Sequence, residues 1–336
     1  MPGAFETSAK TLLRSALDPA CKLLPEWLSA SLLERWGSGM DVALCFHRVL
    51  SQRRAGDPLP SQTISPEILD GFLEIARRAR DRGQGPERLT LTFDDGYRDA
   101  VDYVASRAPL YPEIEWLVFV CPEKLVSRAG YRWDLWEVTP STRRRPLELE
   151  GIREETHPAL ENRRPELRAL GDSPDFVLAS VESCLALLEH PNVALGNHSN
   201  SHLALALLDE ETSRREIEES TRGFEELFGQ CRHFAFPFGV PGLDFGTREV
   251  EVLRRCAPGA VLWSSEHRPY HPPERCSGAV LPRIAVRGDW SAKTLATWVA
   301  LLARREAARG LSEQRQSYSP ASRTTEKEDD AMAGAG

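Results

Sequence analysis

The sequence has no paired or clustered cysteines. Its cysteines are scattered along the chain without a Cys-x-x-Cys pair: Cys21, Cys45, Cys121, Cys184, Cys231, Cys256 and Cys276. An odd, unpatterned set is typical of reduced thiols in a cytosolic protein and not of a disulfide framework. We therefore expect a cytoplasmic protein without disulfide bonds.

The sequence also lacks a secretory leader and any long apolar run. The stretch of residues 9–17 is interrupted by Lys10, Thr11, Arg14 and Ser15, which excludes a signal-peptide core. No apolar run approaches the ~20 residues that span a bilayer. The net charge of -8 argues against a nucleic-acid surface. We expect no nucleic-acid partner and no integral membrane span, and the oligomeric state stays open.

Two adjacent aspartates end an alternating apolar run in residues 89–97. Leu-Thr-Leu-Thr-Phe is followed there by Asp94, Asp95, Gly96 and Tyr97. Successive side chains of a strand point to opposite faces, so both carboxylates enter one pocket only where the strand ends and turns. Gly96 can supply the turn, because glycine adopts backbone angles that other residues resist. An ordinary Asp-Gly turn with solvated carboxylates is the alternative.

Two histidines follow another apolar run, about a hundred residues later. His198 and His202 come just after the apolar residues 193–195. Imidazoles at i and i+4 past a strand can converge on one side of a turn and, with a carboxylate, bind zinc or a similar first-row ion. The pattern is not His-Glu-x-x-His, because Ser199 stands in the place of the glutamate. A pair of surface histidines is the alternative.

A third segment completes an ordered set of motifs. Residues 232–239 read Arg-His-Phe-Ala-Phe-Pro-Phe-Gly. Together with residues 92–96 (Thr-Phe-Asp-Asp-Gly) and 198–202 (His-Ser-Asn-Ser-His), they resemble, in the same order, the first three motifs of the polysaccharide deacetylases, the family 4 carbohydrate esterases. The resemblance extends from about residue 42 to residue 300.

The resemblance implies a metal-dependent hydrolase of bacterial type that cleaves carbon–nitrogen bonds of linear amides. Asp95, His198 and His202 would hold a divalent metal, foremost Zn²⁺, with Co²⁺, Ni²⁺ and Mn²⁺ as alternatives. Three protein ligands leave room for water and a substrate carbonyl, as catalytic zinc sites require. Asp94 would accept the proton of the attacking water. The backbone N–H near Tyr97 would act as the oxyanion donor.

The predicted general acid is a histidine after the first strand. The apolar residues 42–46 predict a buried strand that ends at His47. A circularly permuted branch of the family has a histidine there in place of the catalytic histidine near the C-terminus. This chain lacks a C-terminal Leu-x-His, and His267 and His271 lie in a proline-rich segment. We therefore predict that His47 is the acid, with a simple polar strand cap as the alternative.

One position departs from the family pattern. Many members have an arginine two residues before the proline of the third motif, and this chain has Ala235 there. Arg232 lies three residues earlier and therefore on the opposite face of the strand. Arg283, at the end of a later strand, is the candidate to supply the missing charge beside Asp94, and an ordinary surface salt bridge is the alternative.

The remaining candidates belong to the wall of the pocket. Asp289 and Trp290 resemble the short fourth motif of the family, and Trp133 and Trp136 could stack on a sugar face. Packing in a hydrophobic core is the alternative for these tryptophans. The predicted substrate-binding residues are Pro237, Phe238, Gly239, Trp290, Arg283 and Trp133.

Strands alternating with helices predict an α/β fold. We expect an incomplete or distorted (β/α) barrel of about seven parallel strands, with the site at their carboxyl ends. Residues 1–40 would form an N-terminal helical extension and residues 41–310 the barrel. Residues 121–175 would form an insertion over the site. Residues 311–336 would form a disordered tail.

The resemblance implies removal of an N-acetyl group from an N-acetylhexosamine in a glycan, a glycolipid or a glycan precursor. Cytoplasmic placement favours a precursor, a lipid-linked oligosaccharide or a small glycoside. Three alternatives remain open: hydrolysis of another amide on the same scaffold, removal of an O-acetyl ester, and an inactive glycan-binding protein. Ala235 and the absent C-terminal histidine suggest the last alternative, whereas the complete set of Asp94, Asp95, His198 and His202 argues against it.

Overall fold

The computed structural model describes residue 28 and residues 39–51, 62–138, 152–153, 165–170 and 177–317. The predicted N-terminal extension lies outside this part of the chain, apart from Leu28, Gly39 and Met40. The end of the predicted tail, beyond residue 317, also lies outside it.

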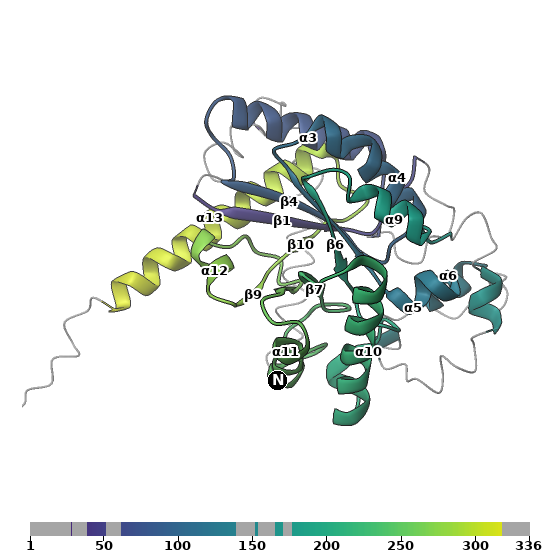
Figure 1. Ribbon diagram of the computed structural model, residues 1–336. Helices are drawn as coiled ribbons and strands as arrows, with labels where there is room; N and C mark the ends of the chain where they lie inside the picture. Colours follow the sequence, from purple (N-terminus) through teal and green to yellow (C-terminus); the bar gives the residue numbers. More distant parts are fainter. Residues whose placement is uncertain are drawn as a thin grey trace, which may run out of the picture.

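The fold is built on one parallel sheet of eight strands in the order β10-β1-β4-β5-β6-β7-β8-β9 (Figure 1). All of its neighbouring strands pair in parallel. The strands are β1 (Asp41–Phe46), β4 (Arg88–Phe93), β5 (Glu115–Val120), β6 (Val193–Asn197), β7 (His233–Ala235), β8 (Val261–Trp263), β9 (Val280–Leu281) and β10 (Ile284–Ala285). A separate two-stranded sheet pairs β2 (Arg48–Val49) with β3 (Thr63–Ile64).

The two ends of the large sheet are joined by one short segment of the chain. β9 pairs with β8 at one end and β10 pairs with β1 at the other, although only Pro282 and Arg283 separate them. Pro282 has no N–H to donate, so the hydrogen-bonded pairing of the chain is interrupted between the end of β9 and the start of β10. The sheet therefore curls into an incomplete barrel. If β9 and β10 count as one bent segment, the eight strands become seven, as predicted.

Helices cover the outside of the curled sheet. In Figure 1, α3, α4 and α9 lie above the strands and α10 and α11 lie below them. The helices are α3 (Pro66–Asp81), α4 (Arg98–Arg107), α5 (Pro122–Ser127), α6 (Arg132–Val138), α9 (Val181–Leu187), α10 (Glu210–Phe228), α11 (Thr247–Cys256), α12 (Pro272–Cys276) and α13 (Ala292–Ser317), with 3-10 turns η1 (Ala108–Leu110) and η3 (Leu205–Leu207). Within the described ranges, none of the helices has both the length and the apolar composition needed to cross a bilayer.

The helix boundaries follow from local sequence. Ser65 caps α3 by accepting a hydrogen bond from Ile68 N, and Asp209 caps α10 by accepting one from Thr212 N. α13 continues to Ser317, past residue 311, where we expected the tail to begin. Residues 312–317 contain Glu, Gln and Arg, which are good helix formers and can extend a helix that is already nucleated.

Side chains that face the inside of the barrel lead directly to the site. Alternation along β1 puts Cys45 and then His47 on the face of Ala43, which belongs to the inner core cluster. Along β6, Gly196 precedes His198 on the same face, and a Cβ at Gly196 would lie 2.3 Å from the Phe119 ring. The inner core consists of Ala43, Leu117, Phe119, Ala235, Trp263, Tyr270 and Leu281. Small residues above this layer leave room for a pocket at the carboxyl ends of the strands.

Candidate active site

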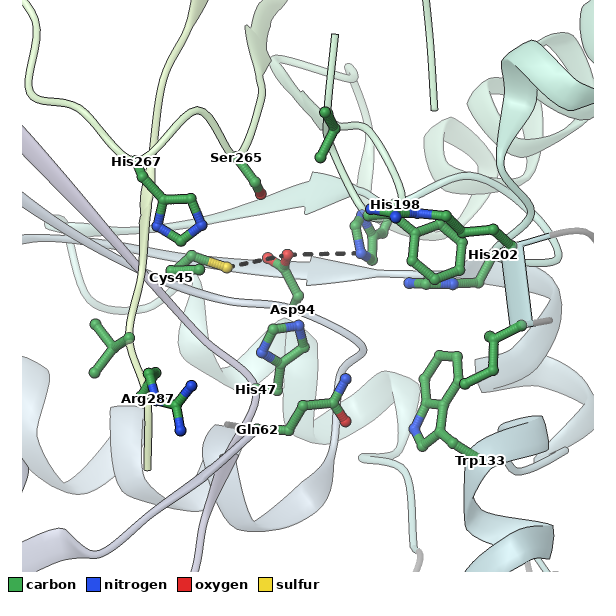
Figure 2. A pocket seen from close by; sticks show the side chains of 16 residues that line it. Cys45, His47, Gln62, Asp94, Trp133, His198, His202, Ser265, His267 and Arg287 are labelled. Carbon is green, nitrogen blue, oxygen red and sulfur yellow. Dashed lines mark hydrogen bonds and ion pairs between the residues drawn. The ribbon is translucent and has the colours of Figure 1, made fainter. Parts of the chain in front are cut away.

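A pocket of about 370 Å³ opens at the carboxyl ends of β1, β4 and β6 (Figure 2). This volume is typical of a site for a small ligand. Several predicted residues line it together, although they lie far apart in the sequence: His47, Asp94, Trp133, His198, His202 and Phe238.

Asp95, His198 and His202 form a compact group of possible metal ligands. Their ligand atoms lie within 4.8 Å of one another, and all three residues are buried. Asp95 Oδ1 lies 3.4 Å from His202 Nε2 and 3.8 Å from His198 Nε2. Nitrogen and oxygen ligands at ~2.0 Å from a tetrahedral zinc lie about 3.3 Å apart, so the group needs only a small contraction to bind one ion.

The backbone turns sharply at Asp95 to bring its carboxylate to the histidines. Asp95 has φ 73° and Gly96 has φ 69°, so both residues are in the left-handed region. We expected Gly96 alone to make this turn, but the aspartate itself adopts the less favourable conformation. The hydroxyl of Tyr131 donates to the Asp95 carbonyl oxygen at 2.8 Å and holds the turn. His202 is also left-handed, with φ 59°.

The two imidazoles have the protonation state that metal binding requires. His198 Nδ1 lies 2.8 Å from the Ala235 carbonyl oxygen, which can only accept, so Nδ1 carries the hydrogen. The Nε2 lone pair therefore faces both carboxylates, with Asp94 Oδ2 at 3.6 Å and Asp95 Oδ1 at 3.8 Å. Burial lowers the pKa of His198, and burial together with the nearby His198 lowers the pKa of His202 well below its usual value. Both rings are therefore neutral at pH 7.

Asp95 is a buried carboxylate that forms no hydrogen bond with a cationic side chain in the described part of the chain, although Lys124 and Arg132 are near enough to lower its pKa. Within the described residues, neither of its carboxylate oxygens has a hydrogen-bond partner. Burial raises its pKa well above the usual value, and the nearby Asp94 and Asp134 raise it further. Burying an ionised carboxylate costs folding free energy unless a cation lies beside it. One carboxylate and two neutral imidazoles fit a divalent ion of the zinc type.

Asp94 has a different environment, because Arg283 neutralises it. Arg283 Nη1 donates to Asp94 Oδ1 at 2.6 Å and Nη2 donates to Oδ2 at 3.0 Å. Thr92 Oγ1 and the Ser264 carbonyl oxygen also accept hydrogen bonds from this guanidinium. Burial alone would raise the pKa of Asp94, but the charge of Arg283, with His198 and His47, holds it well below its usual value. The chain thus has an arginine beside this aspartate despite Ala235.

His47 lies on the same side of the pocket as Asp94. Its ring, the Asp94 carboxylate and the Cys45 thiol have atoms within 4.8 Å of one another. Burial lowers the pKa of His47 to about 4, although Asp94 opposes the shift. His267 also lines the pocket, and its backbone N–H donates to Arg283 O at 3.0 Å. The proline-rich surroundings of His267 do not predict this position. The pocket therefore contains a second candidate for the acid.

Tyr97 lies beside the turn, but its side chain serves a structural role. The buried hydroxyl donates to the Asp134 carboxylate at 2.8 Å. Arg98 N donates to Val177 O, and Ala179 N donates to Gly96 O, so Tyr97 and Leu178 form a pair without hydrogen bonds of their own. In such a pair the N–H of Tyr97 points away from Leu178. Its role as an oxyanion donor stays a prediction.

The predicted aromatic residues have different surroundings. Trp133 lines the pocket, but its ring stacks on Tyr131 at 4.6 Å and its Nε1 donates to Tyr97 Oη at 2.9 Å. One face of Trp133 is therefore already covered. Trp290 belongs to the outer core, 5.8 Å from the Trp298 ring, and is not among the residues that line this pocket. These contacts favour core packing, the alternative reading for Trp290, and its place in the pocket wall stays a prediction.

The third motif forms a tight turn at the edge of the pocket. Gly239 N donates to Pro237 O at 2.6 Å, and Phe238 between them has φ 59°. This is a three-residue turn of the γ type. The Phe238 ring lines the pocket and meets His202 edge-on at 5.1 Å. Position 239 requires glycine because Ser265 packs closely against its Cα, and a Cβ there would lie 2.8 Å from Ser265 Oγ.

Several pocket residues carried no signal in the sequence. Arg153 comes from the predicted insertion, and its Nε lies 2.9 Å from Asp244 Oδ1. The insertion therefore contributes to the pocket through Trp133, Ile152 and Arg153. The pocket-lining residues that were not predicted are Cys45, Gln62, Ile152, Arg153, Val240, Ser265, His267, Ala285, Val286 and Arg287. They come from separate segments of the chain, and only tertiary contacts bring them together.

Comparisons with known proteins agree with this architecture. No protein-family model matches the chain, and no curated protein matches it significantly in sequence. BC0361, a polysaccharide deacetylase from Bacillus cereus, is similar in structure, with 10% identity, a TM-score of 0.50 and coverage of 77% of this chain and 69% of its own. BA0330, a candidate polysaccharide deacetylase from Bacillus anthracis, has 10% identity, a TM-score of 0.51 and the same coverage, 77% and 69%. At such low identity the likeness concerns the fold. The circular permutation that His47 suggested stays a prediction.

Proposed function

We propose that this chain, which has the fold of the polysaccharide deacetylases, is a metal-dependent hydrolase that removes the N-acetyl group of an N-acetylhexosamine in a glycan, glycolipid or glycan precursor. One observation carries the proposal. The carboxylate of Asp95, which has no hydrogen-bond partner among the described residues, and the neutral rings of His198 and His202 gather at one point, next to a second carboxylate, Asp94, that Arg283 holds ionised. A glycan-binding protein has no need of this arrangement.

The residues around the site divide the chemistry of amide hydrolysis between them. When bound, a divalent ion polarises the acyl oxygen and lowers the pKa of water from ~15.7 toward ~7. Asp95, His198 and His202 would hold the ion. Asp94 accepts the proton of the attacking water, and its bidentate pair with Arg283 fixes the orientation of its two oxygens.

His47 delivers a proton to the departing amine. Because the pKa of His47 is about 4, the ring is uncharged at pH 7 and must first receive the proton that it donates. Asp94 is its close neighbour and takes that proton from water. The proton therefore passes from water through Asp94 and His47 to the amine nitrogen. Without it, the amine would have to leave as an unstable anion.

The pocket volume bears on the size of the substrate, and the free cysteines bear on the cellular compartment. A volume of about 370 Å³ has room for one sugar residue with its acetyl group. Every described cysteine has a free thiol, as we expect in a reducing compartment. A glycan precursor, a lipid-linked oligosaccharide or a small glycoside fits both observations.

Acetate release tests the proposal. We expect the purified protein to release acetate from at least one N-acetylated sugar in a panel of monosaccharides, oligosaccharides and glycan precursors. A chelator should abolish the release, and Zn²⁺ or Co²⁺ should restore it, because the reaction needs the ion held by Asp95, His198 and His202. Activity that persists without metal would contradict the mechanism. Acetate release from O-acetyl esters alone would contradict the substrate class.

Replacing His47 should affect amides more than activated esters. Loss of a positioned acid costs roughly 10²-fold or more when the leaving group needs a proton, and much less when it leaves readily as an anion. We therefore expect His47→Ala to slow amide cleavage by about that factor and the hydrolysis of an activated acetyl ester only slightly.

His267→Ala provides the matched comparison, because both histidines line the same pocket. It should change the two reactions equally and weakly. If His267→Ala gives the selective loss and His47→Ala does not, the acid is His267. Equal losses in amide and ester hydrolysis for His47→Ala would also remove His47 from this role.

A further inference from the structure

A second cluster of metal-binding side chains lies on the other side of Asp94. Cys45, His47 and Asp94 offer a thiol, an imidazole and a carboxylate whose ligand atoms all lie within 4.8 Å of one another. Cys45 Sγ donates to Asp94 Oδ2 at 3.4 Å. Figure 2 shows Cys45 and His198 on opposite sides of the Asp94 carboxylate, with His47 facing the same carboxylate. The mechanism above does not use the thiol.

We propose that Cys45, His47 and Asp94 form a second, thiolate-containing site for a soft divalent ion such as Zn²⁺ or Cd²⁺. The spacing fits a tetrahedral ion. A sulfur at ~2.3 Å and an oxygen at ~2.0 Å from tetrahedral zinc lie about 3.5 Å apart. The observed separation of Cys45 Sγ and Asp94 Oδ2 is 3.4 Å.

The ion occupies the position of the thiol hydrogen. Cys45 loses its proton to solvent on binding, as thiol ligands do, and the ion then bridges the sulfur and Asp94 Oδ2. Arg283 keeps its two hydrogen bonds to Asp94, because each carboxylate oxygen has two lone pairs. His47 completes the set through a ring nitrogen. Its Nδ1 is buried and has no hydrogen-bond partner within the described residues.

The two sites should differ in affinity and in metal preference. Asp95 has no hydrogen-bonded counter-ion among the described residues, whereas Arg283 already neutralises Asp94, so the site of Asp95, His198 and His202 fills first. Thiolate favours soft ions, so the second site binds Zn²⁺ and Cd²⁺ and rejects Mg²⁺ and Mn²⁺.

When an ion occupies the second site, Asp94 and His47 are bound to it and can no longer transfer protons. Excess zinc therefore inhibits the enzyme, a consequence that rests on the proposed function. The binding itself does not depend on that function.

Cobalt spectroscopy tests the second site without any measurement of activity. A thiolate ligand gives Co²⁺ a charge-transfer band in the near ultraviolet, and the site of Asp95, His198 and His202 contains no sulfur. The titration uses metal-free full-length protein with Cys21→Ser and Cys276→Ser, because Cys276 is exposed and Cys21 lies outside the described residues. We expect no thiolate band with the first equivalent of Co²⁺ and its appearance with the second.

Cys45→Ser and Cys45→Ala in the same background should abolish the band and leave the first equivalent bound. Cys184→Ser is the matched control, because this cysteine is also buried but lies on α9 in the outer core. It should keep the band. The two Cys45 substitutions differ in polarity, and circular dichroism confirms that at least one of them is folded. A band that persists without Cys45, or no band in excess Co²⁺, would overturn the second site.

Zinc inhibition provides the functional readout. Cys45→Ala should raise the Zn²⁺ concentration for half-inhibition by about tenfold or more, as expected for loss of a metal ligand. Unchanged zinc sensitivity in Cys45→Ala would overturn the inhibitory role. If the protein releases no acetate, the proposed function fails, while the cobalt band still decides whether the second site exists.

Discussion

Asp95→Asn is expected to lose both the metal and the hydrolytic activity. Asp95 is the anionic member of the ligand group, and an amide at this position removes the charge that attracts the ion. Asparagine is also one of the few residues that tolerate φ 73°, so the turn is kept while the charge is removed. Loss of several kcal/mol of transition-state stabilisation corresponds to a fall in kcat/KM on the order of 10³-fold or more.

The same substitution should not destabilise the metal-free protein. Burial raises the pKa of Asp95 well above its usual value, so the ionised carboxylate opposes folding at neutral pH when no ion is present. Replacing it with a neutral amide relieves this cost. We therefore expect equal or higher stability of the variant without metal, and no further gain when Zn²⁺ is added, whereas the parent protein gains stability by mass action.

Metal content after dialysis and urea unfolding with and without Zn²⁺ measure these effects. Asp209→Asn is the matched control, because asparagine caps helix α10 as well as aspartate does and this residue lies outside the pocket. The control should bind metal and gain stability like the parent protein. Full metal content in Asp95→Asn would refute the assignment of this ligand.

The parts of the fold that sequence predicted are those that local pattern controls. Ser65 and Asp209 are helix caps, and short-range hydrogen bonds determine them. The aspartates and histidines could be assigned to one site because parallel strands bring their carboxyl ends to one edge of the sheet. That argument needs only the order of the strands and a motif at the end of each.

The features that were missed depend on distant contacts or on backbone strain. Arg283 was the predicted partner of Asp94, but its route to Asp94 has no local signal, because residues 280–285 bring it there by joining the two ends of the sheet. His267 enters the pocket from a segment whose prolines predict only a loop. Composition could not separate core packing from the pocket wall for Trp290, because that distinction depends on tertiary neighbours such as Trp298. The left-handed conformation of Asp95 could not be predicted, because only a few per cent of non-glycine residues adopt it, even though aspartate does so more often than most.

Arg283→Leu should impair both stability and activity, because it leaves Asp94 buried without a counter-ion. Breaking a buried ion pair by removing one partner costs about 3–5 kcal/mol. In the parent protein the pKa of Asp94 is held below its usual 3.8, so the stability contributed by this ionised carboxylate is present above that pH and is lost as the pH falls further. In the variant, burial raises this pKa above 3.8, and falling pH relieves the buried charge by protonating it.

The difference in unfolding free energy between parent and Arg283→Leu is therefore largest near pH 7 and shrinks as the pH falls. Urea unfolding of the metal-free proteins measures it. The combined variant Asp94→Asn with Arg283→Leu should recover most of the lost stability, because it removes both charges. A difference that does not change with pH would show that Arg283 acts through packing and not through the charge of Asp94.

Activity separates the two roles of this arginine. A raised pKa of Asp94 moves the acidic limb of the kcat/KM profile to higher pH, because the proton acceptor must be ionised. We expect Arg283→Leu to lose about 10²-fold to 10⁴-fold at neutral pH, the usual worth of a general base. Arg283→Lys should recover part of the activity and most of the pH profile, since a lysine keeps the charge but not the bidentate geometry. The combined variant, although more stable than Arg283→Leu, should stay inactive. If it were as active as the parent protein, Asp94 would have no part in the reaction, and Arg283 would be a structural residue only.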